Sequence, residues 1–503
     1  MKQTLQSLCT TLLAAFCCNA LAGAAGRGPI ERVLLVSVDG LHALDLSIFT
    51  ARHPDSALAQ LAARGIEYTQ AHTVVPADSF PGLLALATGG TPAVTGVYYD
   101  VTYDRRLSPP GGGCSSAGTP VVYDESTDAP GAPRGEPVLD ARRLPLDPDD
   151  CAPVPPHDYL RVNTVFEVIR QAGGHTAWID KHPVYEILDG PSGQGVEDLY
   201  TPEIGGDFEG RAAKGASRIT ASIQRTERYD AMKAQALIHE IDGFRHGGRT
   251  PAPVPQLFGL NLQAVNVGEK LGGYLDARGD PSPKLEGALE HCDRLIGRIV
   301  AELRARALLD STLLIVTAKH GNGPIDPRAL RHVDRKTLVR AIERAAPGAL
   351  AQLTTDQGAL VWLHDQSKTA LVAQALERRR ASLGIRRVLY GARLELDFPS
   401  PQSDSRTPDL IVVARNGVIY GKTNDRKKAE HGGFLADDTH VALLVSNPVL
   451  SRLEVRAPVF TTQVASTILE SLRLSPRRLL AVREQGTPAL PGPDWRALAT
   501  ADR

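Results

Sequence analysis

The sequence predicts an α/β fold in which a doubly wound, mainly parallel sheet carries a smaller α/β cap. Two apolar runs rich in branched side chains, at residues 33–38 and 312–318, are typical of strands buried on both faces of such a sheet. An amphipathic helical pattern at residues 285–307 precedes the second run, as expected for the crossovers that join parallel strands. The length of 503 residues allows one large core and a subdomain.

Residues 1–22 are typical of a secretory signal peptide. Lys2 precedes an apolar run at residues 12–16, and residues 20–22 (Ala-Leu-Ala) form a small-residue cleavage site. The apolar run is too short to span a bilayer. We therefore expect a periplasmic or secreted protein without a membrane span.

The composition excludes partners that are recruited by bulk charge. Hydrophobic residues make up 42% of the chain and charged residues 22%, which indicates a soluble globular protein. The formal net charge is −1, so nothing favours a nucleic-acid scaffold or a membrane surface as partner.

The first predicted strand, at residues 33–38, ends in Asp39. A carboxylate just past the end of a buried strand lies where open α/β sheets bind their ligands. The alternative role for Asp39 is to cap the next helix.

A helix is predicted directly after Ser79. The stretch Pro-Ala-Asp-Ser-Phe-Pro-Gly at residues 76–82 places Pro81 near the first turn, and Gly89 and Gly90 suit the end of the helix. Backbone N–H groups at a helix N-terminus favour an anion, so Ser79 is suited to attack a phosphate or sulfate ester. The alternative is that Ser79 only caps the helix.

A long insert is expected at residues 101–158, where helical and strand periodicity is lost and Gly, Pro and Asp dominate. Cys114 and Cys151 bracket part of it, and in an oxidising compartment they can form a disulfide. Outside the signal peptide the chain has one more cysteine, Cys292, on a predicted helix where a small buried side chain is expected.

A weaker candidate site follows the strand predicted at residues 175–179. Asp180, Lys181 and His182 form a charged cluster at its end and are candidates for substrate binding. The alternative is a solvated loop, because charged side chains usually face water.

Two further strands also end in polar side chains. The strand at residues 256–262 places Asn261 near its end, as a candidate for substrate binding. The strand at residues 312–318 is followed by Lys319 and His320, and a lysine and a histidine at the mouth of a sheet favour a functional site.

The rest of the chain completes the predicted organisation. The catalytic core is expected at residues 27–330 and 426–480, with an α/β cap at 331–425 between them. The second part of the core contains His431, and the Pro- and Gly-rich residues 481–503 are expected to be a loosely ordered tail.

The candidate residues share one structural position. Asp39, Ser79, Lys319, His320 and His431 all lie in loops next to apolar strands, and a doubly wound sheet collects such strand ends at one edge. Carboxylate and imidazole groups are ligands of zinc. A hydroxyl held against such an ion loses its proton more easily and can attack phosphorus.

The order of the motifs resembles the alkaline phosphatase superfamily, and most closely its type I phosphodiesterase/nucleotide pyrophosphatase branch. The motifs are Val38-Asp39-Gly40, Ser79-Phe80-Pro81, His320-Gly321 and His431-Gly432. The resemblance implies an alkaline-phosphatase-like sheet in which Ser79 forms a covalent phospho-enzyme. It also implies that Asp39 and His320 bind one divalent metal ion, expected to be zinc, and that His431 binds a second.

The sequence departs from the family pattern at two metal positions. Lys319 stands where the family has an aspartate, and the stretch after residue 258 has Asn261, Gln263, Asn266 and Glu269 where the family has an aspartate and then a histidine. An ammonium repels a nearby dication. We therefore expect one zinc ion rather than two, and we predict that the Lys319 ammonium stabilises the negative charge that develops in the reaction.

The resulting hypothesis is an exported hydrolase of small phosphoric esters, such as phosphodiesters or nucleotide pyrophosphates, that acts through a phosphoserine. The missing ligands leave a non-catalytic binding protein on the same fold as an alternative. A third hypothesis is an enzyme that transfers the phosphoryl group to an acceptor other than water, or that acts on sulfuric esters.

Overall fold

The computed structural model describes residues 29–129, 138–206, 218–422 and 424–498. The signal peptide predicted at residues 1–22 lies outside these residues. None of the helices in the described part of the chain is long and apolar enough to cross a membrane.

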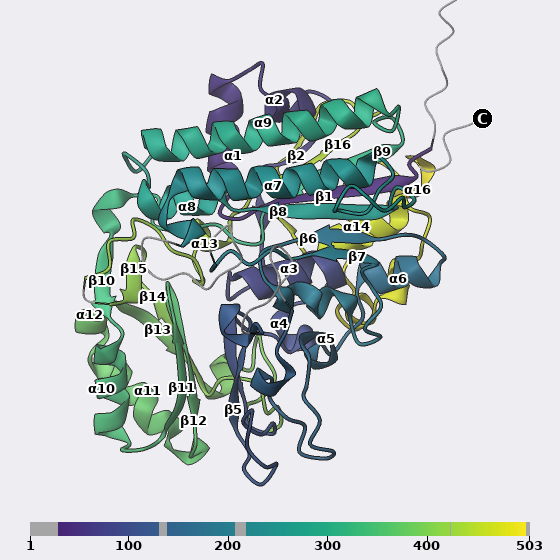
Figure 1. The fold of residues 1–503 in the computed structure, drawn as a ribbon. Helices are drawn as coiled ribbons and strands as arrows, with labels where there is room; N and C mark the ends of the chain where they lie inside the picture. Colours follow the sequence, from purple (N-terminus) through teal and green to yellow (C-terminus); the bar gives the residue numbers. More distant parts are fainter. Residues whose placement is uncertain (1–28, 130–137, 207–217, 423, 499–503) are drawn as a thin grey trace, which may run out of the picture.

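An eight-stranded sheet forms the centre of the molecule (Figure 1). In spatial order its strands are β17 (Leu453–Val455), β2 (Gly65–Tyr68), β16 (Leu443–Ser446), β9 (Thr312–Thr317), β1 (Arg32–Val38), β8 (Leu257–Leu262), β6 (Ala177–Ile179) and β7 (Asp198–Tyr200). Neighbouring strands are parallel except where β16 pairs with β9 and β2. The mainly parallel sheet predicted from the apolar runs is confirmed.

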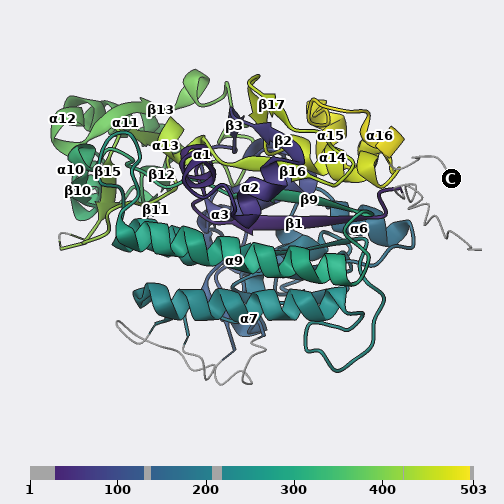
Figure 2. The same ribbon diagram turned by 90° about the horizontal axis from the view of Figure 1, so that it is seen from above.

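Helices cover both faces of this sheet. One face carries α1 (Ala43–Arg52), α2 (Ala57–Ala62), α7 (Ile223–Ile241), α8 (Ala264–Leu271) and α9 (Pro283–Ala305). The other carries α3 (Ser79–Thr88), α6 (Val165–Gln171) and α14 (Gln463–Ser471). Figure 2 shows α7 and α9 side by side, below β1 in that view. Because both faces are covered, β1 is apolar on both: Leu34 and Val36 enter one core, and Val33 and Leu35 the other.

A second sheet stands beside the first (Figure 1, lower left). Its four strands are, in spatial order, β11 (Leu350–Thr355), β12 (Gly358–Leu363), β14 (Leu410–Ala414) and β13 (Ile385–Leu389), and all its pairs are antiparallel. α10 (Lys336–Ala345) and α11 (Thr369–Arg378) pack on one of its faces. The turn between β11 and β12 reaches the central part of the molecule, where the Gln357 N–H donates to the His431 carbonyl at 3.0 Å.

Shorter elements connect these layers. They are β3 (Ala71–His72), α4 (Pro92–Thr95), α5 (Pro156–Tyr159), β10 (Arg331–Asp334), α12 (Arg380–Leu383), β15 (Val418–Gly421), α13 (Ala436–Thr439) and β18 (Val459–Phe460). β10 pairs with β15, and β3 with β18, in parallel.

The insert after residue 100 has more structure than its composition indicated. β4 (Val101–Asp104) and β5 (Thr119–Val122) form an antiparallel hairpin, and Tyr123 is buried against Phe80 with ring centroids 4.7 Å apart. The disulfide between Cys114 and Cys151 is present, with a Cα–Cα distance of 5.7 Å. Cys292 is a buried free cysteine, as expected.

The expectation of a loose tail is wrong for its described part. α15 (Leu480–Gln485) and α16 (Trp495–Leu498) pack against the core, and Trp495 is only 2% exposed. Its indole N–H donates to the Leu490 carbonyl at 2.8 Å. One large aromatic side chain with a satisfied N–H therefore anchors a segment whose Pro and Gly content indicated disorder.

Candidate active site

Ser79 is the first residue of α3, and it does not cap the helix. Asp78 is the N-cap, and its carboxylate accepts the backbone N–H of Phe80 at 3.3 Å. The helix ends at Gly89, whose φ of +75° suits a residue without a side chain. The capping role considered for Ser79 is therefore wrong, and its hydroxyl is available for other partners.

Gly82 allows the first turn of α3 to lie against the chain that follows β9. A Cβ atom at this position would lie 2.0 Å from the carbonyl oxygen of Lys319. No other residue type fits such a close backbone approach without displacing one of the two segments. The glycine thus brings Ser79 beside the residues at the end of β9.

The Ser79 hydroxyl lies between an imidazole and an ammonium. Its Oγ is 3.2 Å from Nε2 of His320 and 3.1 Å from Nζ of Lys181. Nδ1 of His320 is 3.1 Å from the Gly321 carbonyl, which can only accept, so we assign the ring proton to Nδ1. Nε2 is then free to accept the hydroxyl proton of Ser79, while Lys181 donates to Oγ.

Asp39 follows β1 and is fully buried. Its Oδ2 accepts hydrogen bonds from Lys181 Nζ at 2.9 Å, from Asn261 Nδ2 at 3.3 Å and from Gln263 Nε2. Burial by itself would raise the pKa of Asp39, but the charges of Lys181 and Lys319 hold this pKa well below its usual value. Asp39 does not cap α1, because His42 is the N-cap there.

Lys319 and Asp180 form a buried ion pair next to this group. Nζ of Lys319 donates to both carboxylate oxygens of Asp180, at 3.1 and 2.9 Å, and lies 4.3 Å from the centroid of the Tyr185 ring. Burial lowers the pKa of Lys319, although the Asp180 charge opposes this shift. The structure thus differs from the prediction for Lys319: its ammonium is bound by Asp180, whereas the ammonium that reaches Ser79 belongs to Lys181.

The loop after β6 is not the solvated loop considered from the sequence. Asp180 and Lys181 are buried and His182 is half-buried, with its Nδ1 2.8 Å from Oε2 of Glu203. The pKa of Lys181 is raised, because the charges of Asp39 and Asp180 outweigh the effect of burial, which would lower it. Lys181 therefore carries a positive charge beside Ser79.

His431 lies on the other side of His320. The two imidazole rings are stacked with their centroids 3.9 Å apart. Nδ1 of His431 is 3.1 Å from Oε1 of Glu430, and Nε2 is 3.5 Å from Oδ2 of Asp78. Burial would lower the pKa of His431, but these two carboxylates raise it to about 9. Burial, followed by the charge of His431, lowers the pKa of His320 well below its usual value.

Asn322 is a site residue that the sequence reasoning missed. Its side chain donates to Oδ1 of Asn266 at 3.0 Å and to Glu269, and its Oδ1 is 3.2 Å from Nδ1 of His431. It follows His320 by two positions, so its place in the same loop was the available signal. Asp78 was also missed as a partner of His431, although it directly precedes Ser79.

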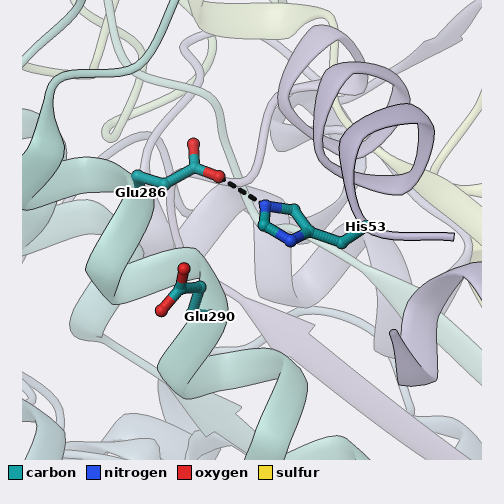
Figure 3. A group of neighbouring side chains, drawn as sticks. All are labelled: His53, Glu286 and Glu290. Carbon is teal, nitrogen blue, oxygen red and sulfur yellow. Dashed lines mark hydrogen bonds and ion pairs between the residues drawn. The ribbon is translucent and has the colours of Figure 1, made fainter. Parts of the chain in front are cut away.

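The predicted metal ligands Asp39, His320 and His431 do not gather into a metal-binding group. In the described part of the chain, the groups of three or more close donors are His53, Glu286 and Glu290, and Glu125, His182 and Glu203. The first of these groups joins the end of α1 to α9 (Figure 3), on the face of the sheet opposite α3. Of the predicted ligands, Asp39 instead accepts a hydrogen bond from the Lys181 ammonium, which also donates to Ser79. This arrangement does not fit a metal ion, and no reaction step below uses one.

A comparison with protein families identifies the chain. The sequence model of the type I phosphodiesterase / nucleotide pyrophosphatase family matches residues 33–434. The chain belongs to this family. The match includes every candidate residue from Asp39 to His431, and membership makes the chain a hydrolase of phosphoric esters of the phosphodiesterase and phosphatase kind.

Solved structures show the same fold as this family member. Murine ectonucleotide pyrophosphatase / phosphodiesterase 5 is 15% identical in sequence and matches with a TM-score of 0.57. The match covers 88% of this chain and 96% of the murine chain. Wild-type alkaline phosphatase PafA is 13% identical, covers 89% and 96%, and has a TM-score of 0.60. These likenesses confirm the alkaline-phosphatase-like fold predicted from the sequence. A comparison with curated protein sequences finds no match.

Proposed function

We propose that this family member cleaves a phosphodiester of a small molecule through a covalent phosphoserine at Ser79. One observation carries the proposal: the Ser79 hydroxyl, at the N-terminus of α3, both faces Nε2 of His320 and accepts a hydrogen bond from Lys181. A hydroxyl with an adjacent base and an adjacent positive charge is an activated nucleophile. The positive end of α3 also favours the phosphoryl oxygens.

The first half of the reaction transfers the phosphoryl group to the enzyme. Oγ of Ser79 attacks phosphorus while its proton passes to Nε2 of His320. The Oγ–P bond forms, the bond from phosphorus to the leaving oxygen breaks, and the leaving group departs with the bonding electron pair and takes a proton from water. The product is an enzyme phosphorylated at Ser79 that keeps the second ester group of the substrate on phosphorus, with a protonated His320.

The second half returns the enzyme to its starting state. Water attacks phosphorus and releases one proton to the solvent, which balances the proton taken up by the leaving group. The P–Oγ bond breaks, and His320 returns its proton to Oγ of Ser79. The net reaction consumes one water and yields an alcohol and a phosphomonoester.

The Ser79→Ala variant tests the proposal. We expect it to abolish turnover of an aryl phosphodiester while the melting temperature and circular dichroism spectrum stay those of the wild type. Ser47→Ala, which changes an exposed serine on α1, is the matched control and keeps full activity. Acid quench during turnover, followed by mass spectrometry, traps the phosphoserine. Unchanged turnover in Ser79→Ala contradicts the assignment of the nucleophile.

The substrate panel also separates the alternative hypotheses. An inactive form of the murine phosphodiesterase 5 has been solved in complex with AMP, so nucleoside phosphodiesters belong in the panel beside aryl esters and sulfates. Phosphorylated alcohols formed in the presence of added alcohol indicate a transferase. Ligand binding without any turnover favours the non-catalytic binding protein.

The proposal includes export and leaves the predicted zinc as a hypothesis. Cleavage after residue 22 follows from the sequence pattern and is tested by N-terminal sequencing of the protein released from a bacterial host. The sequence predicts zinc at Asp39 and His320, and the resemblance implies a second ion at His431. The donors around Ser79 do not fit these ions, and metal analysis of the purified protein tests the prediction. The Asn261, Asp180 and His182 side chains likewise stay candidates for substrate binding.

A further inference from the structure

Lys181 holds the position between the carboxylate and the nucleophile. Its Nζ is 2.9 Å from Oδ2 of Asp39 and 3.1 Å from Oγ of Ser79. The Lys181 side chain is 11% exposed, and that of Asp39 is fully buried. The Lys181 ammonium therefore bridges the buried Asp39 carboxylate and the Ser79 hydroxyl. This is the position in which the sequence predicted a metal ion.

The charges around this bridge are already balanced. Asp39 and Asp180 contribute two negative charges, and Lys181 and Lys319 contribute two positive ones, with each ammonium bonded to a carboxylate. A divalent cation added between Asp39 and Ser79 would leave two uncompensated positive charges in a buried group. Such an excess is costly where the surroundings are poorly hydrated.

The neighbours of Asp39 present hydrogen-bond donors rather than metal ligands. The amide nitrogens of Asn261 and Gln263 both point at Oδ2 of Asp39, where an N–H group cannot bind a cation. Oδ1 of Asp39 has no hydrogen-bond partner, but no group of three donors within 4.8 Å of one another includes it in the described chain. The side chains of Asn261 and Gln263 thus suit Asp39 as a carboxylate that pairs with an ammonium.

We propose that the Lys181 ammonium replaces a metal ion as the cation that activates Ser79 and stabilises the transition state. The inference rests on the function proposed above. When the hydroxyl proton passes to His320, Lys181 keeps its own protons and its N–H stabilises the negative charge on Oγ and then on the phosphoryl oxygens. Asp39 positions the ammonium. The reaction is then independent of divalent metal.

The first experiment measures metal dependence in the wild type. We expect the purified full chain to hold no zinc at this site, to keep its melting temperature in a strong chelator, and to keep its turnover after dialysis against the chelator. Two clusters of possible metal ligands lie away from Ser79 in the described chain, and Glu203→Gln and Glu290→Gln each remove one ligand from one of them. Zinc that disappears in either variant is assigned to the cluster that this variant disrupts. Zinc that is lost only in Asp39→Asn overturns the inference, whether or not the protein turns over the chosen ester.

The second experiment removes the ammonium. Lys181→Ala is expected to lower kcat by about 10²–10³-fold, the usual loss when one stabilising donor is removed. Ethylammonium added to the buffer is expected to restore part of kcat, because it can occupy the vacated space, whereas a lysine with a purely structural role gives no such recovery. Lys284→Ala, an exposed position on α9, is the matched control and keeps its activity with and without the amine.

The outcomes separate this inference from the proposed function. Turnover that persists in Ser79→Ala contradicts the function itself. Turnover that depends on Ser79, is lost in chelator and returns with zinc leaves the function in place and overturns the role of Lys181. A loss of activity in Lys181→Ala without recovery by ethylammonium, in a variant with wild-type melting temperature, also overturns that role.

Discussion

The two sides of Ser79 neutralise their buried charges in different ways. On the lysine side, formed by Asp39, Asp180, Lys181 and Lys319, every carboxylate is bonded to an ammonium. The pKa of Asp39 is held well below its usual value despite burial, and the pKa of Lys181 is raised above its own. These two charges consequently stay fixed across the whole range of neutral pH.

The carboxyl side, formed by Asp45, Glu269, Tyr274, Glu430 and His431, has more acids than cations. The single hydroxyl hydrogen of Tyr274 faces both Asp45, at 3.0 Å, and Glu269, at 2.9 Å, so it can satisfy only one of them. Burial raises the pKa of Asp45 to about 7 and that of Glu269 well above its usual value. Asp45 and Glu269 therefore hold protons where the lysine side holds ammonium groups, and the charge of the carboxyl side changes with pH near neutrality.

The largest expected effect on stability comes from breaking the lysine side. Lys319→Met leaves the Asp180 carboxylate buried without its cation, and we expect the free energy of unfolding to fall by about 3–5 kcal/mol. Urea denaturation near neutral pH measures this change. Adding Asp180→Asn to Lys319→Met is expected to recover part of the loss, because an amide has no charge to compensate.

An exposed ion pair provides the control for this experiment. Arg278 is paired with Asp276 at 2.8 Å, but its side chain is 83% exposed. Arg278→Met is expected to leave the free energy of unfolding almost unchanged, because water screens this ion pair. Equal losses of unfolding free energy in Arg278→Met and Lys319→Met would show that burial does not increase the contribution of the Lys319–Asp180 ion pair to stability.

The comparison also shows what the sequence could predict. The strands at β1 and β9 were predicted within one residue or so at each end, because a continuous apolar run is a local pattern. Asp39 and Ser79 were placed correctly at the ends of local elements for the same reason. These predictions needed no knowledge of which segments meet.

The partners of Ser79 could not be predicted in the same way. The contact with Lys181, which follows β6, joins residues 102 positions apart, and Lys319 competes for the same role from the end of β9. The choice between them depends on Asp180, which binds Lys319 and leaves Lys181 to Asp39. Charged residues in a loop are exposed by default, so the burial of this group had no signal in the sequence alone.

A smaller effect on the free energy of unfolding is expected from replacing Asp45, an acid of the carboxyl side that holds a proton near neutral pH. The folded Asp45 carboxyl keeps its proton up to a pKa of about 7, whereas the unfolded chain releases it near the ordinary pKa of 3.8. Between these values the folded state binds more protons than the unfolded state, so stability falls as the pH rises. Asp45→Asn removes this penalty, and we expect it to raise the free energy of unfolding by about 2–4 kcal/mol above neutral pH.

The pH dependence distinguishes this prediction from a simple packing effect. The advantage of Asp45→Asn over the wild type is expected to vanish as the pH falls below 3.8, where the wild-type carboxyl becomes protonated in both states. Urea titrations at several pH values give the two stability curves. Parallel curves for the two proteins would show that Asp45 does not hold the proton.

The smallest effect is expected at Glu430, the one acid of the carboxyl side that two lysines bind. Its pKa lies well below its usual value, because Lys270 and Lys427 outweigh the effect of burial. Lys427 is 40% exposed and Lys270 only 17%, so water screens the first pair more than the second. Lys427→Met is expected to lower the free energy of unfolding by about 0–1 kcal/mol, and Lys270→Met by more. Equal and large losses would mean that Glu430 needs both cations, and that the carboxyl side is compensated as fully as the lysine side.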